Sequence, residues 1–241
     1  MGRHGTIAGR KAAQDKKRGA IFTKVTREII VAAKGGGDPE YNASLKNAIS
    51  KAKAVNLPNE KINNAIKKGT GEIEGESYES TTFEGYGPSG VAVIVDVLTD
   101  NKNRTTSNIK HAFDKNGGNM GVSGCVAYMF ERKGIILVEK SDSVDEDALM
   151  EAALDAGAED FIVDDEYYEI QTTTDDFHAV ADALTSAGYE FLESDIELVP
   201  NMESAPKTDS DLKALQKMIE MLEEDDDVQK VYTNSSVDLH A

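Results

Sequence analysis

The first third of the chain repeats apolar residues at helical spacing and is broken by glycine and proline. Apolar residues recur every four positions from Ile21 to Ala33, and the glycines at 35–37 end that pattern. Asp38 before Pro39 is a favourable start for a second helix, and a third helix follows Pro58. The pattern predicts a small three-helix domain.

The pattern changes after a glycine-rich and acidic linker at 69–76. β-Branched and aromatic residues fill 78–84 and 91–98 on either side of a glycine loop, which predicts a pair of strands. We also expect a strand from Cys125 to Phe130. Residues 134–199 then predict strand, helix, strand, strand, helix, strand, the order of a ferredoxin-like βαββαβ domain.

Two predicted helices begin with capping signals. Ser143 with Glu146 and Thr208 with Asp211 have the spacing of a capping box. The second pair begins a helix in the tail, which ends with a short strand near 228–232 and has no core of its own. The segment 78–130 lacks one helix and one strand, so we expect the tail to supply them.

These elements together predict an α+β fold with three domains. It consists of an N-terminal three-helix domain plus two ferredoxin-like (βαββαβ-type) α/β domains, one inserted into the other. The expected boundaries are 1–76 for the basic helical domain with its N-terminal arm, 77–133 plus 206–241 for one α/β domain, and 134–205 for the inserted one.

Charge is distributed unevenly along the chain. The protein has 241 residues and a net charge of −18, yet residues 1–70 hold 15 basic and 5 acidic side chains, a net of +10. Such asymmetry is typical of a basic segment that binds a polyanion, while the acidic remainder maintains solubility and offers surfaces to protein partners. The alternative is that the lysines only solvate helix faces.

Several classes of function are disfavoured by the composition. No apolar run approaches the length of a membrane helix, and a single cysteine, Cys125, allows neither a disulfide framework nor a cysteine-built zinc site. The four histidines lack metal-ligand spacing, and we interpret the acidic runs at 164–166 and 223–227 as solvated turns. We therefore expect a protein of a reducing intracellular compartment that is no enzyme and has no metal and no cofactor.

The candidate nucleic-acid-binding residues lie mainly in the arm and the first helix. Aromatic residues for stacking on open single strands are missing there except Phe22, whose helical position predicts a core role, so we favour duplex or structured nucleic acid. Phosphate contacts of this kind give affinity without sequence readout. The candidates are Arg3, Arg10, Lys11, Lys16, Lys17, Arg18, Lys24, Arg27 and Arg104.

Ordered sequence blocks over nearly the whole chain resemble the YebC family, bacterial proteins related to the mitochondrial translational activator of cytochrome c oxidase. The chain departs from the family pattern at 5–7, where Gly-Thr-Ile replaces a Ser-Lys-Trp stretch. The matching blocks are RKAAQDKKRG and IFTKVTREI within 10–29, GGGDP at 35–39, AIKKGTGE at 65–72, FEGYGPSGVAVIVDVLTDNKNRT at 83–105, FDKNGGNMGVSGCVAYMFERKG at 113–134 and DDDVQKVY at 225–232.

The resemblance implies a cytoplasmic, non-enzymatic protein with a helical N-terminal domain and two α/β domains. It implies a DNA-binding transcriptional regulator or, alternatively, a ribosome-associated translation factor that binds ribosomal RNA and relieves stalling at difficult sequences such as proline runs. A third possibility, from a different class, is a protein-interaction scaffold. Composition does not separate the first two, because both begin with the release of counterions from phosphates.

Overall fold

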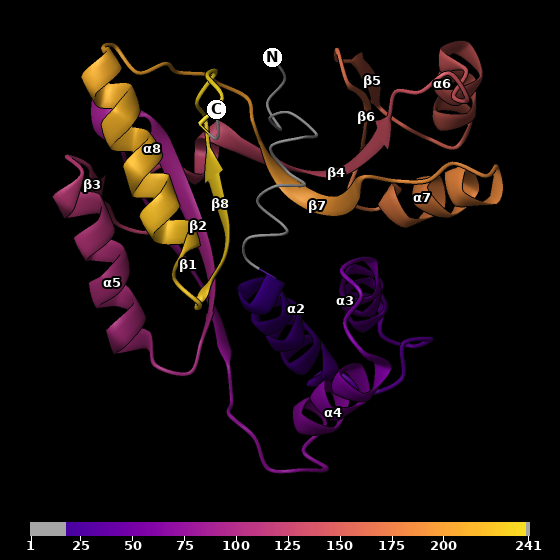
Figure 1. Ribbon diagram of the computed structural model, residues 1–241, viewed down its shortest axis with the longest axis horizontal. Helices are drawn as coiled ribbons and strands as arrows, with labels where there is room; N and C mark the ends of the chain where they lie inside the picture. Colours follow the sequence, from indigo (N-terminus) through magenta and orange to yellow (C-terminus); the bar gives the residue numbers. More distant parts are fainter. Residues whose placement is uncertain (1–17, 240–241) are drawn as a thin grey trace. The chain divides into compact units, whose positions relative to one another are not determined.

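The computed structural model describes residues 18–239, with Arg18 described by its backbone alone. The described chain forms two compact units (Figure 1). One comprises residues 18–127 and 205–233, and the other comprises residues 128–204 and 234–239.

Three helices open the first of these units: α2 (Arg18–Ala33), α3 (Ala43–Ala54) and α4 (Asn59–Gly69). Their apolar faces share one core that includes Ile29, Leu45 and Ile62. Phe22 packs against this core, as its helical position predicts. A glycine in left-handed conformation, Gly36, follows α2, which explains why the helix ends in the glycine run.

The expected start of the second helix at Asp38 is wrong. The Asp38 side chain accepts a hydrogen bond from the Glu40 backbone N–H within a turn, and α3 begins later. Asn42 is the N-cap, with its Oδ1 accepting from the Leu45 N–H at 3.0 Å. The Asn42 amide also donates to the carbonyls of Ala32, in the last turn of α2, and of Gly36, in the loop after it. Asn42 therefore links the end of α2 to the start of α3, and it takes the N-cap position in place of Asp38.

The first sheet uses strands from both parts of its unit. β1 (Glu79–Tyr86) and β2 (Ala92–Thr99) form the expected antiparallel hairpin, joined through a short 3-10 turn. β3 (Asn119–Met120) pairs with β1, and β8 (Val228–Thr233) pairs with β2, giving the order β3-β1-β2-β8. α5 (Lys102–Lys115) and α8 (Asp209–Glu223) pack with these strands. The tail thus supplies one strand and one helix to this layer.

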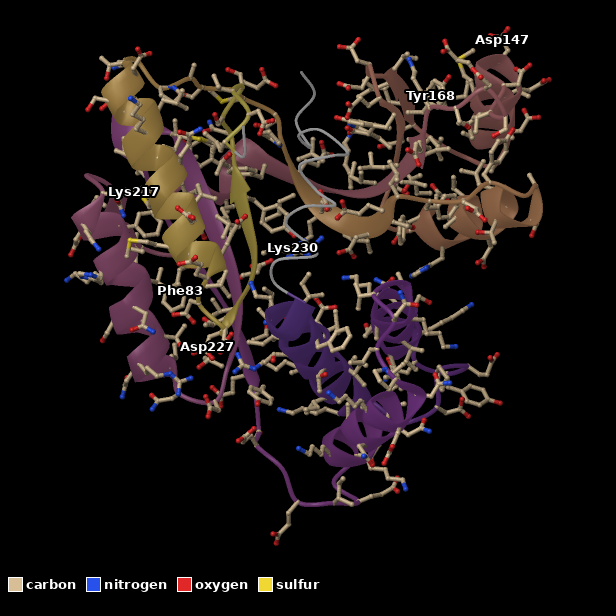
Figure 2. The ribbon with its side chains drawn as sticks, in the orientation of Figure 1. Phe83, Asp147, Tyr168, Lys217, Asp227 and Lys230 are labelled. Carbon is tan, nitrogen blue, oxygen red and sulfur yellow. The ribbon has the colours of Figure 1, made fainter. Side chains whose placement is uncertain are left out.

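The second unit contains a complete βαββαβ arrangement. Its strands are antiparallel in the order β5-β6-β4-β7. Leu149 and Phe177, from its two helices, share a core with Ile136 and Tyr168, so both helices cover the same face of the sheet; Figure 2 labels Tyr168. The elements are β4 (Phe130–Glu139), α6 (Glu146–Asp155), β5 (Asp160–Val163), β6 (Tyr167–Thr172), α7 (Phe177–Ser186) and β7 (Glu193–Pro200).

The helical N-terminal region and the two four-stranded antiparallel sheets confirm the predicted fold class. Of the predicted helix caps and strands, one cap is confirmed, and another cap and one strand are wrong. Thr208 caps α8 by accepting from the Asp211 N–H at 3.1 Å, as expected, whereas Asp145 caps α6 in place of Ser143. Cys125 lies in a bend and not in a strand, because the neighbouring backbone N–H groups donate to the Glu84 carboxylate.

Candidate nucleic-acid interface

In helix α2, the predicted cationic residues Lys24 and Arg27 lie one helical turn apart. Both direct their side chains to the end of α8 and the acidic turn after it. Lys24 Nζ donates to the Glu223 carbonyl at 2.9 Å, and Arg27 Nη1 donates to the Asp227 carboxylate at 2.8 Å and to the Asp226 carbonyl.

The Arg27 guanidinium is nearly enclosed by protein. It also donates to the Leu98 carbonyl at 3.3 Å and lies over the Tyr78 ring, with 4.9 Å between Cζ and the ring centroid. Only 12% of the Arg27 side chain is exposed. Its charge therefore holds α2 on the first sheet.

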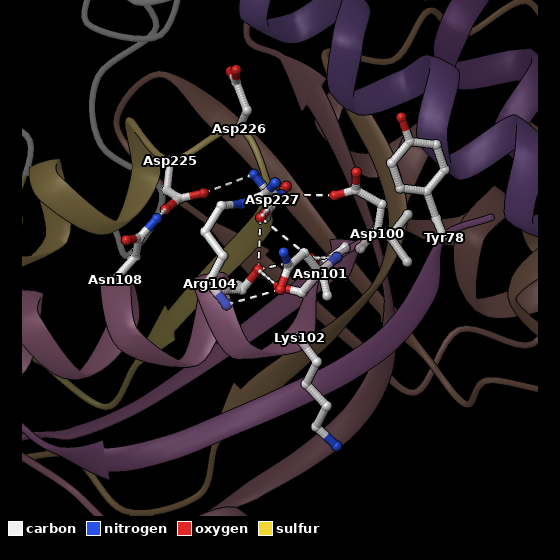
Figure 3. A network of polar contacts seen from close by, with 12 residues as sticks. Tyr78, Asp100, Asn101, Lys102, Arg104, Asn108, Asp225, Asp226 and Asp227 are labelled. Atoms are coloured by element: carbon white, nitrogen blue, oxygen red, sulfur yellow. Dashed lines mark hydrogen bonds and ion pairs between the residues drawn. The ribbon is translucent and has the colours of Figure 1, made fainter. Parts of the chain in front are cut away.

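The Asp227 carboxylate accepts hydrogen bonds from both Arg27 and Arg104, and Figure 3 shows its surroundings. It follows α8 and precedes β8, and its carbonyl accepts from the Leu98 N–H at 2.8 Å. Its carboxylate is 3% exposed and accepts from Arg27, from Arg104 at 2.7 Å and from the Thr105 hydroxyl at 2.6 Å. The Thr99 hydroxyl also donates to this carboxylate, at 3.3 Å. The interpretation of 223–227 as a wholly solvated turn is therefore wrong at Asp227, because four side-chain donors compensate its burial.

The pKa of the Asp227 carboxyl reflects two opposing effects. Burial alone raises this pKa, but the hydrogen bonds from Arg104 and Thr105 and the positive charges of Arg104 and Arg27 outweigh burial. The net result is a pKa below the usual range for aspartate. The group is thus held as a carboxylate.

Arg104 lies in the first turn of α5, whose N-cap Asn101 accepts from the Arg104 N–H at 3.1 Å. Its Nη2 also donates to Asp100 at 2.7 Å. The carboxylates of Asp227 and Asp100 raise the pKa of Arg104, and the hydrogen bond that Arg104 donates to Asp227 has the largest effect. With 46% of its side chain exposed, Arg104 is far more accessible than Arg27.

The nine predicted site residues thus fall into two groups. Lys24, Arg27 and Arg104 come together around the segment 223–227. Arg18 begins α2, and its side chain lies outside the described part of the structure, as do Arg3, Arg10, Lys11, Lys16 and Lys17. Sequence spacing gave no signal for Asp227, which lies 200 residues from Arg27.

Further lysines on α3 and α4 were absent from the predicted set. They are exposed, and their helical faces leave the apolar side to the core. One of them, Lys61, lies over the Phe22 ring at 5.7 Å. The exposed lysines of these helices are Lys46, Lys53, Lys61, Lys67 and Lys68.

An open groove of about 490 Å³ lies along α2 and α3. Glu28 and Lys51 line it, and their charged atoms are 3.5 Å apart. Because these charges offset each other, the groove itself offers little attraction to a phosphate.

Residues 18–239 offer little support for metal or thiol chemistry. No group of three or more His, Cys, Asp or Glu side chains in this range is placed to hold a metal ion. Burial and the Glu84 charge raise the pKa of the Cys125 thiol, which disfavours the nucleophilic thiolate. None of the helices described is long and apolar enough to cross a bilayer.

Two family models match the chain. One, described as the TACO1/YebC protein N-terminal domain, matches residues 3–72, and the other, described as the TACO1/YebC second and third domain, matches residues 78–235.

Individual proteins are similar over nearly the same extent. A probable transcriptional regulatory protein of Clostridioides difficile is 56% identical over 239 residues, which cover 99% of this chain and 100% of the relative. A protein of Clostridium novyi, also described as a probable transcriptional regulatory protein, is 52% identical over 236 residues. The match covers 95% of this chain and 93% of the relative. The crystal structure of a conserved hypothetical protein from Aquifex aeolicus matches with a TM-score of 0.84 at 44% identity, covering 92% of this chain and 91% of that one.

Proposed function

Because the chain belongs to the TACO1/YebC family, whose relatives include probable transcriptional regulatory proteins, we propose that it regulates gene expression by binding DNA through its N-terminal region. In this proposal the protein acts in the cytoplasm, catalyses no reaction, and uses its acidic segments to bind protein partners.

The observation that carries the proposal is the concentration of positive charge in the helical region. Residues 1–70 have a net charge of +10 in a protein whose total is −18. The exposed lysines of α3 and α4 extend the basic character beyond the arm, and side chains of this kind bind phosphates by displacing counterions.

The structure supports a division of roles among the basic residues. We assign phosphate contacts to the arm residues Arg3, Arg10, Lys11, Lys16 and Lys17, to Arg18, and to the exposed lysines. Lys24 and Arg27 instead position α2, because the segment 223–227 already accepts their hydrogen bonds. Arg104 combines the two roles, since about half of its side chain is exposed.

A charge-reversal experiment on the full chain tests this function. Replacing Arg10, Lys11, Lys17 and Arg18 by glutamate should weaken binding to a fluorescent DNA duplex by at least about tenfold. It should also reduce the slope of log affinity against log salt by roughly 0.9 for each phosphate that the variant no longer neutralises. Fluorescence anisotropy at several salt concentrations measures both quantities.

Paired lysine variants provide the matched control. Lys53→Glu with Lys68→Glu should weaken binding, whereas Lys213→Glu with Lys217→Glu, on exposed positions of α8, should have a smaller effect for the same change in charge; Figure 2 labels Lys217. Equal effects of the two pairs, or no salt-sensitive affinity for the duplex, would refute the proposal. Retention on ribosomes with only weak duplex binding would point to structured RNA instead.

A further inference from the structure

The second sheet ends in an exposed apolar strand, β5. Among the described strands β6 is its only neighbour, because the order is β5-β6-β4-β7. The side chains of Ile162 and Val163 in β5 are 40% and 49% exposed. Proteins usually protect such edges, since unpaired backbone groups beside apolar side chains attract another strand. The edge at β5 therefore has the character of a binding surface.

The backbone of β5 offers hydrogen-bonding groups at this edge. Successive residues of an antiparallel strand alternate between bonding to the neighbouring strand and pointing away from it. The Asp164 N–H donates to the Tyr167 carbonyl at 3.0 Å, which fixes the alternation in β5. Phe161 and Val163 therefore point to the open edge. The Phe161 N–H donates to the Asp160 carboxylate at 2.9 Å, whereas the Val163 N–H and C=O have no partner within residues 18–239.

Helix α6 extends the apolar surface beside this edge (Figure 1). Met150 and Leu154 lie one turn apart on α6 and are 38% and 48% exposed. α6 contacts both α7 and β5, so these exposed side chains lie on the flank away from α7 and toward β5. Val163 points to the same side of the sheet, because it lies opposite Tyr168 of the helix-covered core. We call Met150, Leu154 and Val163 the apolar ledge.

Both ends of β5 are acidic. Asp160 begins the strand and Asp165 follows it, and both are exposed. Residues 128–204 hold 22 acidic and 3 basic residues. Of these three cations, Lys133 pairs with a carboxylate at 3.5 Å and Lys140 lies over an aromatic ring at 5.0 Å. The edge is thus complementary to an apolar strand with cations at its ends.

The same charges disfavour a second copy of this chain as the occupant. A second β5 that pairs antiparallel and is centred on Ile162 would place Asp160 opposite Asp164. It would also place Glu159 opposite Asp165. Like charges directly opposite each other destabilise a strand pair.

We propose that β5 binds an extended segment of a partner protein, in which alternating apolar residues are flanked by lysine or arginine. The segment adds a strand by pairing with the backbone of Phe161 and Val163, and its apolar side chains lie on the apolar ledge. Its cations lie near Asp160 and Asp165. This inference rests on the part of the proposed function that assigns protein partners to the acidic segments, and it is independent of nucleic-acid binding.

Fluorescence anisotropy with labelled peptides tests the wild-type full chain. The peptide KTVTVTVK has the proposed pattern, whereas KTPPTPPK keeps its length and charge but lacks backbone donors on both of its edges. The first should bind at least about fivefold more tightly than the second. It should also bind at least about tenfold more tightly than ETVTVTVE, whose ends are acidic. Equal affinities in either comparison would overturn the proposal.

A proline in β5 blocks the edge from the side of the protein. Val163→Pro removes an outward N–H and retains the hydrogen bonds to β6, so the affinity for KTVTVTVK should fall by about fivefold or more. Val163→Thr keeps the N–H and a similar shape, and it should change the affinity by less than about twofold. Equal affinities of the two variants would overturn strand addition. If Val163→Pro fails to fold, the peptide comparison on the wild type decides.

A second pair of variants separates local charge from the overall charge of the protein. Asp160→Asn with Asp165→Asn should weaken binding of KTVTVTVK by about threefold or more at low salt. Glu151→Gln with Asp182→Asn removes the same charge from exposed positions of α6 and α7 and should leave the affinity unchanged. Equal losses in both variants would show that the peptide responds only to net charge, which would overturn the proposal.

Hydrogen exchange locates the bound peptide. Saturation with KTVTVTVK should slow exchange within residues 158–165, and protection confined to other segments would overturn the proposal. A dimer in sedimentation that Val163→Pro abolishes would assign the edge to a second copy and would also overturn it. Duplex DNA binding should be equal in the wild type and Val163→Pro. If the peptide binds but DNA does not, the proposed nucleic-acid function fails while this inference stands, and the reverse result refutes the inference alone.

Discussion

Asp227 receives hydrogen bonds from side chains of three elements, α2, α5 and β2, through one buried carboxylate. A buried charge of this kind is tolerable only while its donors remain in place, because removing one partner leaves the others desolvated. The position of α2 on the first sheet therefore depends on this residue.

Replacing Asp227 by Asn tests that dependence. The substitution leaves Arg27 without its charged partner in a nearly enclosed position, so we expect the free energy of unfolding to fall by about 3 kcal/mol, within the range for broken buried ion pairs. Urea denaturation measures the change. Asp226→Asn is the control, because its side chain is exposed and its carbonyl still accepts from Arg27; equal losses of stability in the two variants would contradict the role of Asp227.

Because the pKa of Asp227 is lowered in the folded protein, the contribution of Asp227 to the free energy of unfolding depends on pH. A carboxyl whose folded pKa lies below its unfolded value of about 3.9 stabilises the fold fully at higher pH and loses that effect as pH falls through the folded pKa. The wild type should therefore lose its stability advantage over Asp227→Asn below about pH 4. An advantage that persists undiminished at pH 2 would contradict this account.

Residue-scale chemistry was only partly accessible from the sequence. The charge excess of residues 1–70 drew attention to Lys24 and Arg27 as phosphate ligands, whereas the structure shows both hydrogen-bonded to the segment 223–227. The capping spacing correctly identified Thr208. The acceptor Asp227 was not identified, because a run of acidic residues looks solvated unless its distant donors are known. Partners separated by 200 residues leave no local pattern.

At the scale of elements, one side chain of β1 shapes an entire loop. The buried Glu84 carboxylate accepts from the backbone N–H groups of Gly124, Val126 and Ala127 at 2.7, 3.0 and 2.9 Å. Burial by itself raises the pKa of Glu84, but these three donors lower it below its usual value. A carboxylate is thus part of the fold of residues 121–127.

Glu84→Gln should loosen this loop. A glutamine offers one acceptor oxygen in place of two and introduces a donor that faces other donors, so we expect stability to fall by about 1–3 kcal/mol. Hydrogen exchange at residues 124, 126 and 127 should accelerate. Glu79→Gln, at an exposed position of the same strand, should change neither exchange nor stability, and protection unchanged in Glu84→Gln would contradict the loop's dependence on Glu84.

This loop also shows why element prediction failed around Cys125. The β-type composition of 125–130 predicted a strand, but hydrogen bonds to Glu84 and the positive φ of Gly124 turn the backbone away from a strand. Elements with strong periodicity, such as α2 and β2, formed where the sequence indicated because their apolar residues have one buried face to fill.

At the scale of the whole molecule, the tail is integral to the first sheet. Its helix buries Leu215, Met218, Ile219 and Leu222 to 3% exposure or less, and β8 extends the sheet beside β2. Removing the tail removes this apolar contact with the first sheet, and the burial of each such side chain stabilises the fold by roughly 1.5–3 kcal/mol. The sum is comparable to the entire stability of a typical domain.

A chain that ends at Pro206 should therefore lose cooperative unfolding of the first sheet. Urea unfolding followed by hydrogen exchange in β1 and β2 measures this effect. A chain that ends at Val237 retains β8 and should behave like the wild type. An unchanged unfolding midpoint in the shorter chain would show that the tail is dispensable.

Overall organisation was predictable to the extent that hydrophobic pattern determines it. The βαββαβ order of the second sheet follows from alternation and caps. That the tail adds a helix and a strand to the first sheet followed from counting the missing elements, but the pairing of β8 with β2 was not predicted. Which side chains of β4, β6 and β7 share a side of the second sheet was not predicted, because the strand register decides it.

The separation between Arg27 and Asp227 has a consequence for biogenesis. Synthesis proceeds from the N-terminus, so α2 leaves the ribosome well before its anchoring carboxylate and the strand beside β2 are translated. Pairings so remote in sequence form slowly, and until they do the hairpin β1–β2 has an unpaired edge prone to aggregation. Nascent chains of this protein should therefore be good clients of chaperones that shield such edges.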